Sequence, residues 1–259
     1  MRIAIMGCGH MGGWLAGQLC KENELAVFDR DAEKARTVSS CGQALASLEQ
    51  LSSFKPGLLL NCVSLEKTQA AFEAALPFLP PACALGDVAS IKGALPEFYK
   101  KTGRPFVSLH PMFGPTFTDM RMLKEENAIA ISESDPALGD LFESFFRRLG
   151  LNFLRMSFAE HDQMMAYSLA LPFASTLVFG ACMKEKTVPG STFKKHLAIA
   201  QGLMSEDDHL LSEILFNPSA LGQLEAVTNR LEFLKHIVKN RDQEEAKRFF
   251  DKIRKQIGE

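Results

Sequence analysis

The chain has 259 residues, of which 46% are hydrophobic and 23% are charged, and its formal net charge is −2. This composition is typical of a soluble globular protein and argues against an intrinsically disordered chain. Lys and Arg residues are scattered along the sequence, so we expect a small-molecule partner and no nucleic-acid surface. The length suits two domains.

Short β-branched or leucine-rich runs alternate with helical patterns in the first half of the chain. The sequence predicts strands at residues 2–7, 25–29, 57–64, 84–90, 104–110 and 128–132, and helices at 10–22, 31–50, near 93–102 and at 136–149. Strands alternating with helices indicate βαβ units. We therefore expect an α/β fold with a doubly wound, mostly parallel sheet and helices on both faces.

The second half of the chain has a helical pattern and no further strand is expected in it. Ser157, followed three residues later by Glu160, forms a capping-box pattern ahead of a long apolar stretch at 166–183. We place the domain boundary near 152–156, with an α/β domain at 1–154 and an all-α domain at 155–259. The apolar stretch contains Tyr, Ser, Thr and Pro, so a buried core helix or a subunit interface explains it better than a membrane span.

The six cysteines lie far apart, without a C-x-x-C pair and without a secretory signal ahead of them; they are Cys8, Cys20, Cys41, Cys62, Cys83 and Cys182. This pattern favours buried thiols in a reducing compartment and predicts a cytoplasmic protein. None of the histidines has metal-ligand spacing with cysteine or carboxylate, so no metal site is expected.

The sequence GCGHMG at residues 7–12 follows the first predicted strand and opens the first predicted helix. In this context G-x-G-x-x-G indicates a dinucleotide-binding Rossmann domain. Gly7 allows the tight turn, Gly9 allows the backbone to approach a pyrophosphate, and Gly12 allows close packing of the helix on the strand. We expect His10 and Met11 to contact the cofactor with these glycines. A glycine-rich turn without a ligand is the alternative.

Asp29 ends the second predicted strand, about 20 residues after the glycines, where a carboxylate accepts hydrogen bonds from the ribose hydroxyls of NAD. Arg30 follows and could instead meet a 2′-phosphate, so NADP is not excluded. The competing interpretation of Asp29 is a helix cap, although Asp31 is better placed for that role. Ser64, at the end of the third predicted strand, is expected to line the same site.

Three predicted strands end in polar side chains, those of Ser64, Ser90 and His110. Because ligands bind outside the carboxyl ends of the strands in such sheets, we expect these side chains to converge on the cofactor. His110 fits a base, or a hydrogen-bond acceptor, for a substrate hydroxyl whose carbon loses hydride. Ser90 would orient it. A single histidine outside such a setting is more often structural.

Four motifs together resemble the prephenate and arogenate dehydrogenases of tyrosine biosynthesis: GCGHMG, DVASIK at 87–92, HPMFGP at 110–115 and EHDQMMAY at 160–167. The resemblance spans nearly the whole chain. It implies a homodimer, formed through the helical domain, that oxidatively decarboxylates prephenate to 4-hydroxyphenylpyruvate, or arogenate to tyrosine, with NAD. It further implies that His110 hydrogen-bonds the C4 hydroxyl of the substrate and that Ser90 stands beside both.

The sequence departs from this family where the substrate is expected to bind. Many members carry S-H-L-P-H where this chain reads LALPF at 169–173, so both histidines are absent, and the arginine expected to bind the side-chain carboxylate falls at Gly202. A substrate with two negative charges needs cationic side chains as binding partners. Candidate substrate contacts are Thr116, His161 and Lys195, with Arg121, Lys194 and His196 as further cations. His161 could equally be an ordinary first-turn helix residue.

Two other functions stay open at this point. One is a different two-domain NAD(P) dehydrogenase or reductase that acts on another hydroxy acid or on an imino acid. The other is a non-catalytic nucleotide-binding dimer that has kept the nucleotide domain and lost substrate binding, which the missing arginine would suit.

Overall fold

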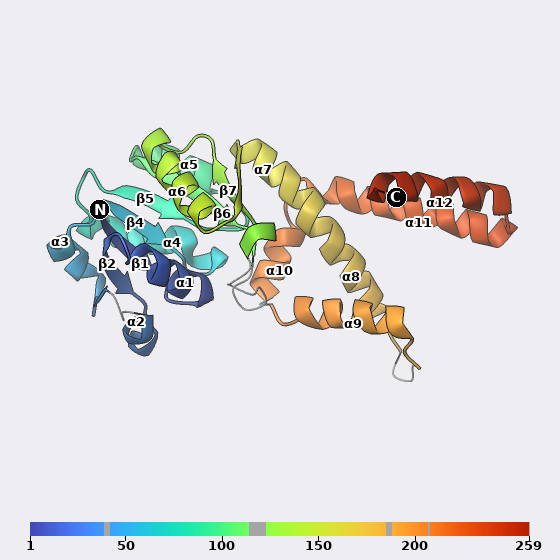
Figure 1. Cartoon of the computed structure of the whole chain (residues 1–259), viewed down its shortest axis with the longest axis horizontal. Coiled ribbons are helices and arrows are strands. Elements are labelled where there is room, and N and C mark those ends of the chain that lie inside the picture. Colours follow the sequence, from blue (N-terminus) through green and yellow to red (C-terminus); the bar gives the residue numbers. More distant parts are fainter. Residues whose placement is uncertain (39–41, 114–122, 185–187, 207, 259) are drawn as a thin grey trace. The chain divides into compact units, whose positions relative to one another are not determined.

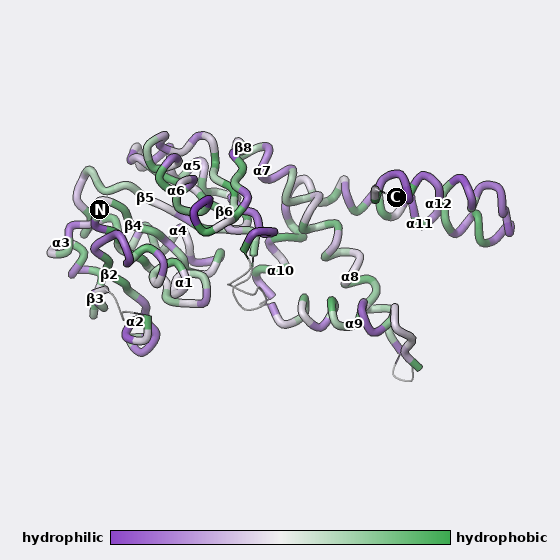
Figure 2. Tube along the Cα trace, viewed as in Figure 1, coloured by the Kyte–Doolittle hydropathy of each residue, from purple (hydrophilic) through white to green (hydrophobic). Residues whose placement is uncertain are grey.

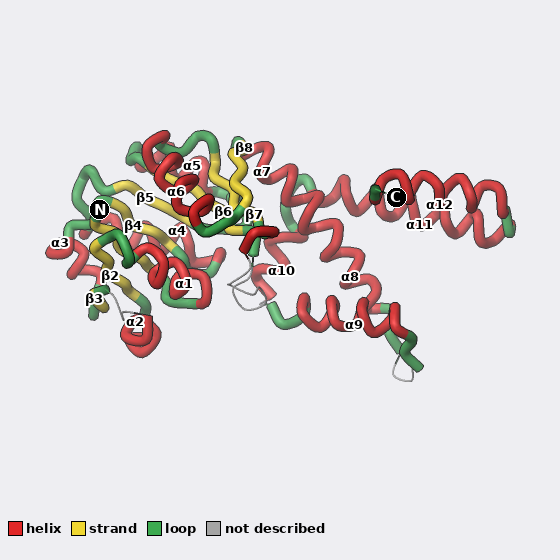
Figure 3. The backbone as a smooth tube through the Cα atoms, in the orientation of Figure 1, coloured by secondary structure: helices red, strands yellow, loops and turns green. Residues whose placement is uncertain are grey.

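The computed structural model describes residues 1–38, 42–113, 123–184, 188–206 and 208–258 (Figure 1). The chain forms two compact units. The first comprises Met1–Met164 with Asp208–Leu210, and the second comprises Met165–Asp207 with Leu211–Glu259. The first unit contains the sheet and the second is built from helices, as Figure 3 shows.

The first unit is organised around one sheet in the order β3-β2-β1-β4-β5-β6-β7-β8. The strands are β1 Arg2–Met6, β2 Glu24–Phe28, β3 Gln43–Ala44, β4 Leu58–Asn61, β5 Ala84–Asp87, β6 Phe106–Pro111, β7 Asn127–Ile131 and β8 Asn152–Met156. All neighbouring pairs are parallel except β6 and β7. The first six strands have the order typical of dinucleotide-binding folds, and the α/β prediction is confirmed.

Helices cover both faces of this sheet because successive side chains of each strand point to opposite faces. One face packs against α1 His10–Leu19, α2 Ala32–Val38 and α6 Pro136–Arg148. The other packs against α3 Leu51–Phe54, α4 Thr68–Ala75 and α5 Leu95–Thr102. Short 3₁₀ turns lie at Leu48–Gln50, Leu65–Lys67, Leu76–Phe78 and Leu123–Glu125. The strands that carry the site are thus held between two hydrophobic layers.

Two predicted boundaries in the first unit are wrong. The predicted helix at 31–50 divides, because α2 ends at Val38 and the short edge strand β3 follows at Gln43–Ala44. The expectation of no strand after residue 132 fails because β8 pairs with β7 at the other edge of the sheet. In β8 Phe153 is buried while Leu154 is exposed. An edge strand with one buried face lacks the continuous apolar run of the central strands.

The second unit is helical, as predicted. It contains α8 Leu171–Ala181, α9 Ser191–Leu203, α11 Ala220–Asn240 and α12 Gln243–Ile257, and α10 Asp208–Leu215 is divided between the two units. Asp242 caps α12 by accepting a 2.9 Å hydrogen bond from the Glu245 N–H. In Figure 2, α12 is mostly hydrophilic and the central strands are mainly hydrophobic.

The helix α7 Phe158–Met165 begins where the capping box predicts. The Glu160 carboxylate accepts the Ser157 N–H at 2.7 Å, and the Ser157 hydroxyl accepts the Glu160 N–H at 3.2 Å. Its first turns nevertheless stay with the first unit, since the ring of Phe158 stacks on Phe106 of β6. The assignment of dinucleotide binding to residues 1–154, and of substrate binding and dimerisation to residues 155–259, remains a prediction.

A five-residue π-helical segment, Ala166–Ala170, connects α7 to α8. Length and composition alone would allow the continuous helix Phe158–Ala181 to cross a membrane, yet only 22% of its most apolar window is buried within this chain. A core of its own chain therefore does not account for the apolar stretch. The other explanation that the sequence favoured, a subunit interface, stays a prediction.

The described cysteines only partly match the expectation of buried thiols. Cys8 and Cys83 are buried free thiols and Cys62 is a half-buried one, but the free thiol of Cys182 is exposed. Cys20, at the end of α1, is disulfide-bonded, so the expectation of a free thiol there is wrong. Cys41 lies outside the described residues.

Candidate active site

The glycine loop between β1 and α1 is constrained at two of its three glycines. Gly7 has φ +95°, and a Cβ there would lie 2.7 Å from the Cys62 carbonyl carbon and oxygen. A Cβ on Gly12 would lie 1.9 Å from the Gly7 carbonyl oxygen. Gly9, the N-cap of α1, is different, because a Cβ there would meet nothing within 4 Å. The fold requires Gly7 and Gly12, whereas Gly9 has open space beside it.

That open space belongs to a cavity of about 450 Å³ at the carboxyl ends of β1 and β4, where the strand order reverses. Such switch points are where ligands bind in doubly wound sheets. Among the residues predicted to bind a cofactor, those that line the cavity are Gly7, Gly9, Asp29, Arg30 and Ser64. The sequence reasoning missed Lys34 and Lys67, which also line it.

The other predicted cofactor residues do not line this cavity. His10 begins α1 and is exposed, and Met11 is half-buried against the hydrophobic layer under α1. Gly12 serves the packing of α1 on the loop. Contacts of these residues with a cofactor remain a prediction.

Asp29 joins the two loops that border the cavity. Its carboxylate accepts a 2.7 Å hydrogen bond from the Cys8 N–H and a 2.9 Å bond from the Asp31 N–H. Asp31 in turn accepts the Glu33 N–H at 3.0 Å at the start of α2, so Asp31 takes the capping role. Each carboxylate oxygen of Asp29 keeps a further lone pair with which it can accept a ribose hydroxyl.

The thiol of Cys8 lies within the glycine loop but is not poised for chemistry. Burial, followed by the negative charge of Asp29, raises the pKa of Cys8 to about 12. A protonated thiol is a poor nucleophile. Cys8 is therefore an inert packing residue.

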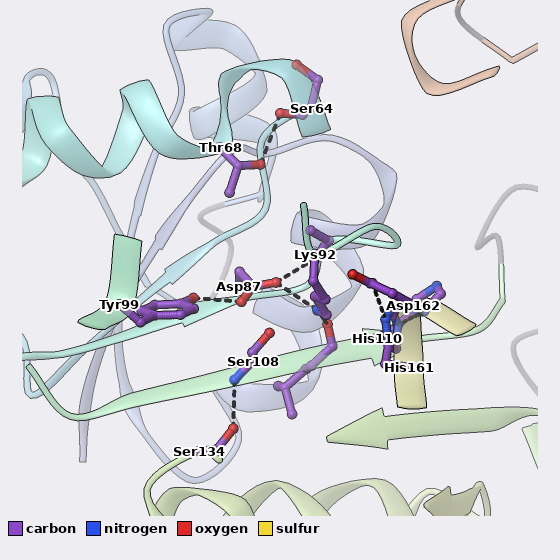
Figure 4. Close-up of polar contacts among 12 residues, drawn as sticks. Ser64, Thr68, Asp87, Lys92, Tyr99, Ser108, His110, Ser134, His161 and Asp162 are labelled. Atoms are coloured by element: carbon purple, nitrogen blue, oxygen red, sulfur yellow. Dashed lines mark hydrogen bonds and ion pairs between the residues drawn. The ribbon is translucent and has the colours of Figure 1, made fainter. Parts of the chain in front are cut away.

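His110 lies near the end of β6, only 6% exposed, beyond the last β5–β6 pair, Asp87 with Ser108. Its Nδ1 is 3.0 Å from Nε2 of the fully buried His161 at the start of α7. Nδ1 of His161 is 3.2 Å from Oδ1 of Asp162 (Figure 4). The structure thus brings together His110 and His161, which lie 51 residues apart in the sequence.

A buried charged network adjoins this pair. Lys92 Nζ donates hydrogen bonds to Oδ1 of Asp87 at 2.9 Å and to the Leu109 carbonyl oxygen at 2.7 Å. The hydroxyl of Tyr99 donates to the other Asp87 oxygen at 2.6 Å (Figure 4). The side chains of Lys92 and Asp87 are both fully buried. The sequence reasoning missed these roles, although two charged residues within the apolar motif DVASIK were a signal for them.

The network controls the charge of the histidines. Burial, then the positive charge of Lys92 and then His161, hold the pKa of His110 well below its usual value. Burial also lowers the pKa of His161, against the hydrogen bond with Asp162, which raises it. Burial lowers the pKa of Lys92, while Asp87 raises it. At neutral pH, His110 is an uncharged imidazole, which can accept a hydrogen bond or a proton.

The other predicted site residues do not take part in the described hydrogen-bond network around His110. Ser90, half-buried after β5, makes no hydrogen bond to His110 in the described structure. Thr116 and Arg121 lie outside the described residues. Lys195 is exposed on α9, as are its neighbours Lys194 and His196. Gly202 also lies in α9, and Ala170 ends the π-helical segment.

Comparison with known proteins finds similarity to arogenate and prephenate dehydrogenases, although no protein-family model matches the chain. The probable arogenate/prephenate dehydrogenase of Methanocaldococcus jannaschii is 23% identical over 270 residues, which cover 98% of this chain. The chain spans 60% of the length of that relative.

Two solved structures share the fold over nearly the whole chain. Synechocystis arogenate dehydrogenase has a TM-score of 0.75 and 22% identity, over 99% of this chain and 98% of that one. Prephenate dehydrogenase from A. aeolicus, in complex with hydroxyphenyl propionate and NAD⁺, has a TM-score of 0.85 and 18% identity. The match covers 99% of this chain and 96% of that one. The resemblance inferred from the motifs is confirmed at the level of sequence similarity and fold.

Proposed function

We propose that this chain is an NAD-dependent dehydrogenase that oxidatively decarboxylates prephenate to 4-hydroxyphenylpyruvate, or arogenate to tyrosine. The observation that carries the proposal is His110, a buried, uncharged imidazole at the same sheet edge as the glycine-lined cavity. The similarity to arogenate and prephenate dehydrogenases supports the choice of reaction.

The cavity residues fit a dinucleotide. The open side of Gly9 leaves room for a pyrophosphate against the N-terminus of α1, whose free N–H groups favour an anion. Asp29 would accept the ribose hydroxyls and repel a 2′-phosphate, which favours NAD, whereas Arg30 and Lys34 beside it would attract one. When bound here, NAD would supply the acceptor for the hydride that leaves the substrate ring.

His110 supplies the proton chemistry in this proposal. Its imidazole accepts the proton of the ring hydroxyl as the carbon beneath that hydroxyl loses hydride, and the ring carboxylate leaves as carbon dioxide. The two electrons of the broken C–C bond complete the aromatic ring, and His110 returns the proton to the ring oxygen, which gives the hydroxyl of the product. Aromatisation supplies much of the driving force. The protein mainly contributes alignment and a preorganised electrostatic environment. Ser90 would stand beside His110 and the same hydroxyl.

The contacts to the substrate carboxylates are also part of the proposal. The positions of the two family histidines hold Ala170 and Phe173, and the position of the family arginine holds Gly202. We propose Lys195 and Thr116 as contacts, with the cations of α9 as the source of positive charge. Failure of any ring substrate to react would instead favour a different hydroxy or imino acid, or a non-catalytic nucleotide-binding protein.

We also propose that the protein is a homodimer that associates through its helical unit, and that it is cytoplasmic. Support for the dimer comes from exposed apolar side chains of this unit, namely Val178, Ile199, Met204, Leu221, Leu231 and Val238. Exposed apolar side chains that form a contiguous patch usually mark an interface. The free thiols favour a reducing compartment, while the disulfide at Cys20 is the observation against it. Analytical ultracentrifugation tests the dimer, and a monomer at micromolar concentration would contradict it.

The test of the activity is NADH or NADPH formation by the purified protein in four mixtures, with prephenate or arogenate and with NAD or NADP. We expect turnover with at least one ring substrate and a preference for NAD. Tight nucleotide binding without turnover in any mixture would overturn the proposed reaction.

A further inference from the structure

We propose that His161 and Asp162 are positioning residues that fix the tautomer of His110, so that its Nδ1 carries the proton and its Nε2 presents a lone pair to the substrate. The identity of the group that Nε2 receives rests on the proposed function. The arrangement of the three side chains is independent of it.

The geometry sets the direction of each hydrogen bond. An ionised carboxylate only accepts, so at 3.2 Å from Asp162 the Nδ1 of His161 must be the protonated nitrogen. A neutral imidazole carries one proton, which makes Nε2 of His161 an acceptor. At 3.0 Å from that acceptor, Nδ1 of His110 must donate. Nε2 of His110 is then the free acceptor, as the abstraction of a hydroxyl proton requires.

The surrounding charges keep this chain of hydrogen bonds in its neutral form. Four ionisable groups act on the two rings: Lys92 and His161 lower the pKa of His110, and Asp162 and Asp87 oppose the effect of Lys92 on His161. Lys92 is itself held by Asp87 and is fully buried. A cationic His110 would lie close to a buried ammonium, which disfavours protonation before the substrate arrives.

Removal of the Asp162 carboxylate would release the constraint. His161 could then carry its proton on Nε2, where it would face the Nδ1 proton of His110. Two donors 3.0 Å apart repel each other, so His110 would shift to the Nε2–H tautomer. In that tautomer His110 cannot accept the substrate proton at the nitrogen that faces the substrate.

The hydrogen-bonded chain also accommodates the proton that His110 holds until it returns to the product oxygen. When Nε2 of His110 accepts the hydroxyl proton, the ring becomes an imidazolium and its Nδ1–H continues to donate to His161. The positive charge is balanced through His161 by Asp162, whose side chain is 30% exposed. No oxidant or other co-reactant takes part in this step.

The tautomers can be observed directly in the full-length protein labelled with ¹⁵N-histidine. Long-range ¹H–¹⁵N correlation spectra distinguish Nδ1–H from Nε2–H imidazoles, and the variants His110→Asn and His161→Asn assign two of the six histidine signals. At pH 7.5 we expect both rings to be neutral and to carry the proton on Nδ1. An Nε2–H or cationic His110 would overturn the proposal, whether or not the protein turns over a ring substrate.

A pair of neighbouring acidic residues provides the kinetic test. Asp162→Ala should lower kcat by at least about 10-fold, less than the about 10²-fold or more expected for complete loss of the base, with little change in KM for NAD. It should also shift His110 to the Nε2–H tautomer in the spectrum. The control is Glu160→Gln, which removes the adjacent charge on α7 but keeps the capping bond to Ser157.

The two variants separate the possible outcomes. Unchanged kcat and unchanged tautomer in Asp162→Ala would contradict the positioning role. An equal loss in Glu160→Gln would show that charge or helix stability, and not the tautomer, is responsible. Absence of turnover in the unmodified protein would refute the proposed function alone, because the spectrum still tests the tautomer.

Discussion

The ammonium of Lys92 donates a 2.7 Å hydrogen bond to the carbonyl oxygen of Leu109, the residue directly before His110. This bond follows the last residue pair between β5 and β6, Asp87 with Ser108. Lys92 therefore both anchors the end of the strand that carries the histidine and places a positive charge near its ring.

Replacement of Lys92 by Met should destabilise the fold. The carboxylate of Asp87 would stay fully buried with only the Tyr99 hydroxyl and the Ala89 N–H as hydrogen-bond donors. Removal of one partner of a buried ion pair costs about 3–5 kcal/mol of unfolding free energy. Urea denaturation monitored by circular dichroism measures the loss.

A double variant separates the lost ion pair from lost packing. Lys92→Met combined with Asp87→Asn removes the uncompensated charge, so it should be more stable than Lys92→Met alone. A double variant that is destabilised by the full sum of the single changes would show that Lys92 and Asp87 contribute independently.

His110→Asn should separate catalysis from cofactor binding. An amide cannot take up the hydroxyl proton, and loss of a general base typically lowers kcat about 10²-fold or more. The cavity between β1 and β4 is lined by residues 6–74, so the affinity for NAD should stay nearly unchanged. Steady-state kinetics with a fluorescence titration of the nucleotide checks both quantities. Equal turnover in the variant would remove His110 from the mechanism.

The stability of the fold should fall as the pH drops below about 6.5. The pKa values of His110 and His161 are lowered from 6.5 in the folded chain, so below that pH the unfolded chain binds more protons. The stability that comes from keeping the two histidines neutral is complete above pH 6.5. It is lost as the pH falls towards their pKa values in the folded chain. Urea midpoints between pH 7.5 and 5 should decline less in His110→Asn. A pH-independent midpoint in the unmodified protein would contradict this.

The three glycines of the loop should respond differently to alanine. Gly12→Ala places a Cβ 1.9 Å from the Gly7 carbonyl oxygen and should lower the melting temperature sharply. Gly9→Ala meets nothing within 4 Å and should leave the melting temperature unchanged while weakening NAD binding, because it fills the cavity edge. If Gly9→Ala bound NAD as tightly as the unmodified protein, the cavity would not hold the pyrophosphate.

Sequence patterns predicted those parts of the fold that depend on local periodicity and loop chemistry. The central strands are continuous apolar runs, and Ser157 and Glu160 show where α7 begins. The edge strand β8 escaped prediction because only one of its faces is buried. Local periodicity also does not show that the first turns of α7 belong to the first compact unit, because the stacking of Phe158 on Phe106 joins distant segments.

The buried network around His110 could be predicted only in part for a similar reason. His110 and Ser90 stand at predicted strand ends, so topology indicates them. The contact of His110 with His161 depends on how α7 returns to the sheet, which no local pattern encodes. The buried bonds of Lys92 to Asp87 and Leu109 likewise follow from a loop conformation that periodicity does not describe.

The most direct test of the account is to measure NADH formation and carbon dioxide release together, with saturating NAD and either prephenate or arogenate. We expect the unmodified protein to release one molecule of carbon dioxide for each NADH, and His110→Asn to lose both activities in the same proportion. NADH formation without carbon dioxide, or no reaction with either substrate by a protein that binds NAD, would contradict the assignment.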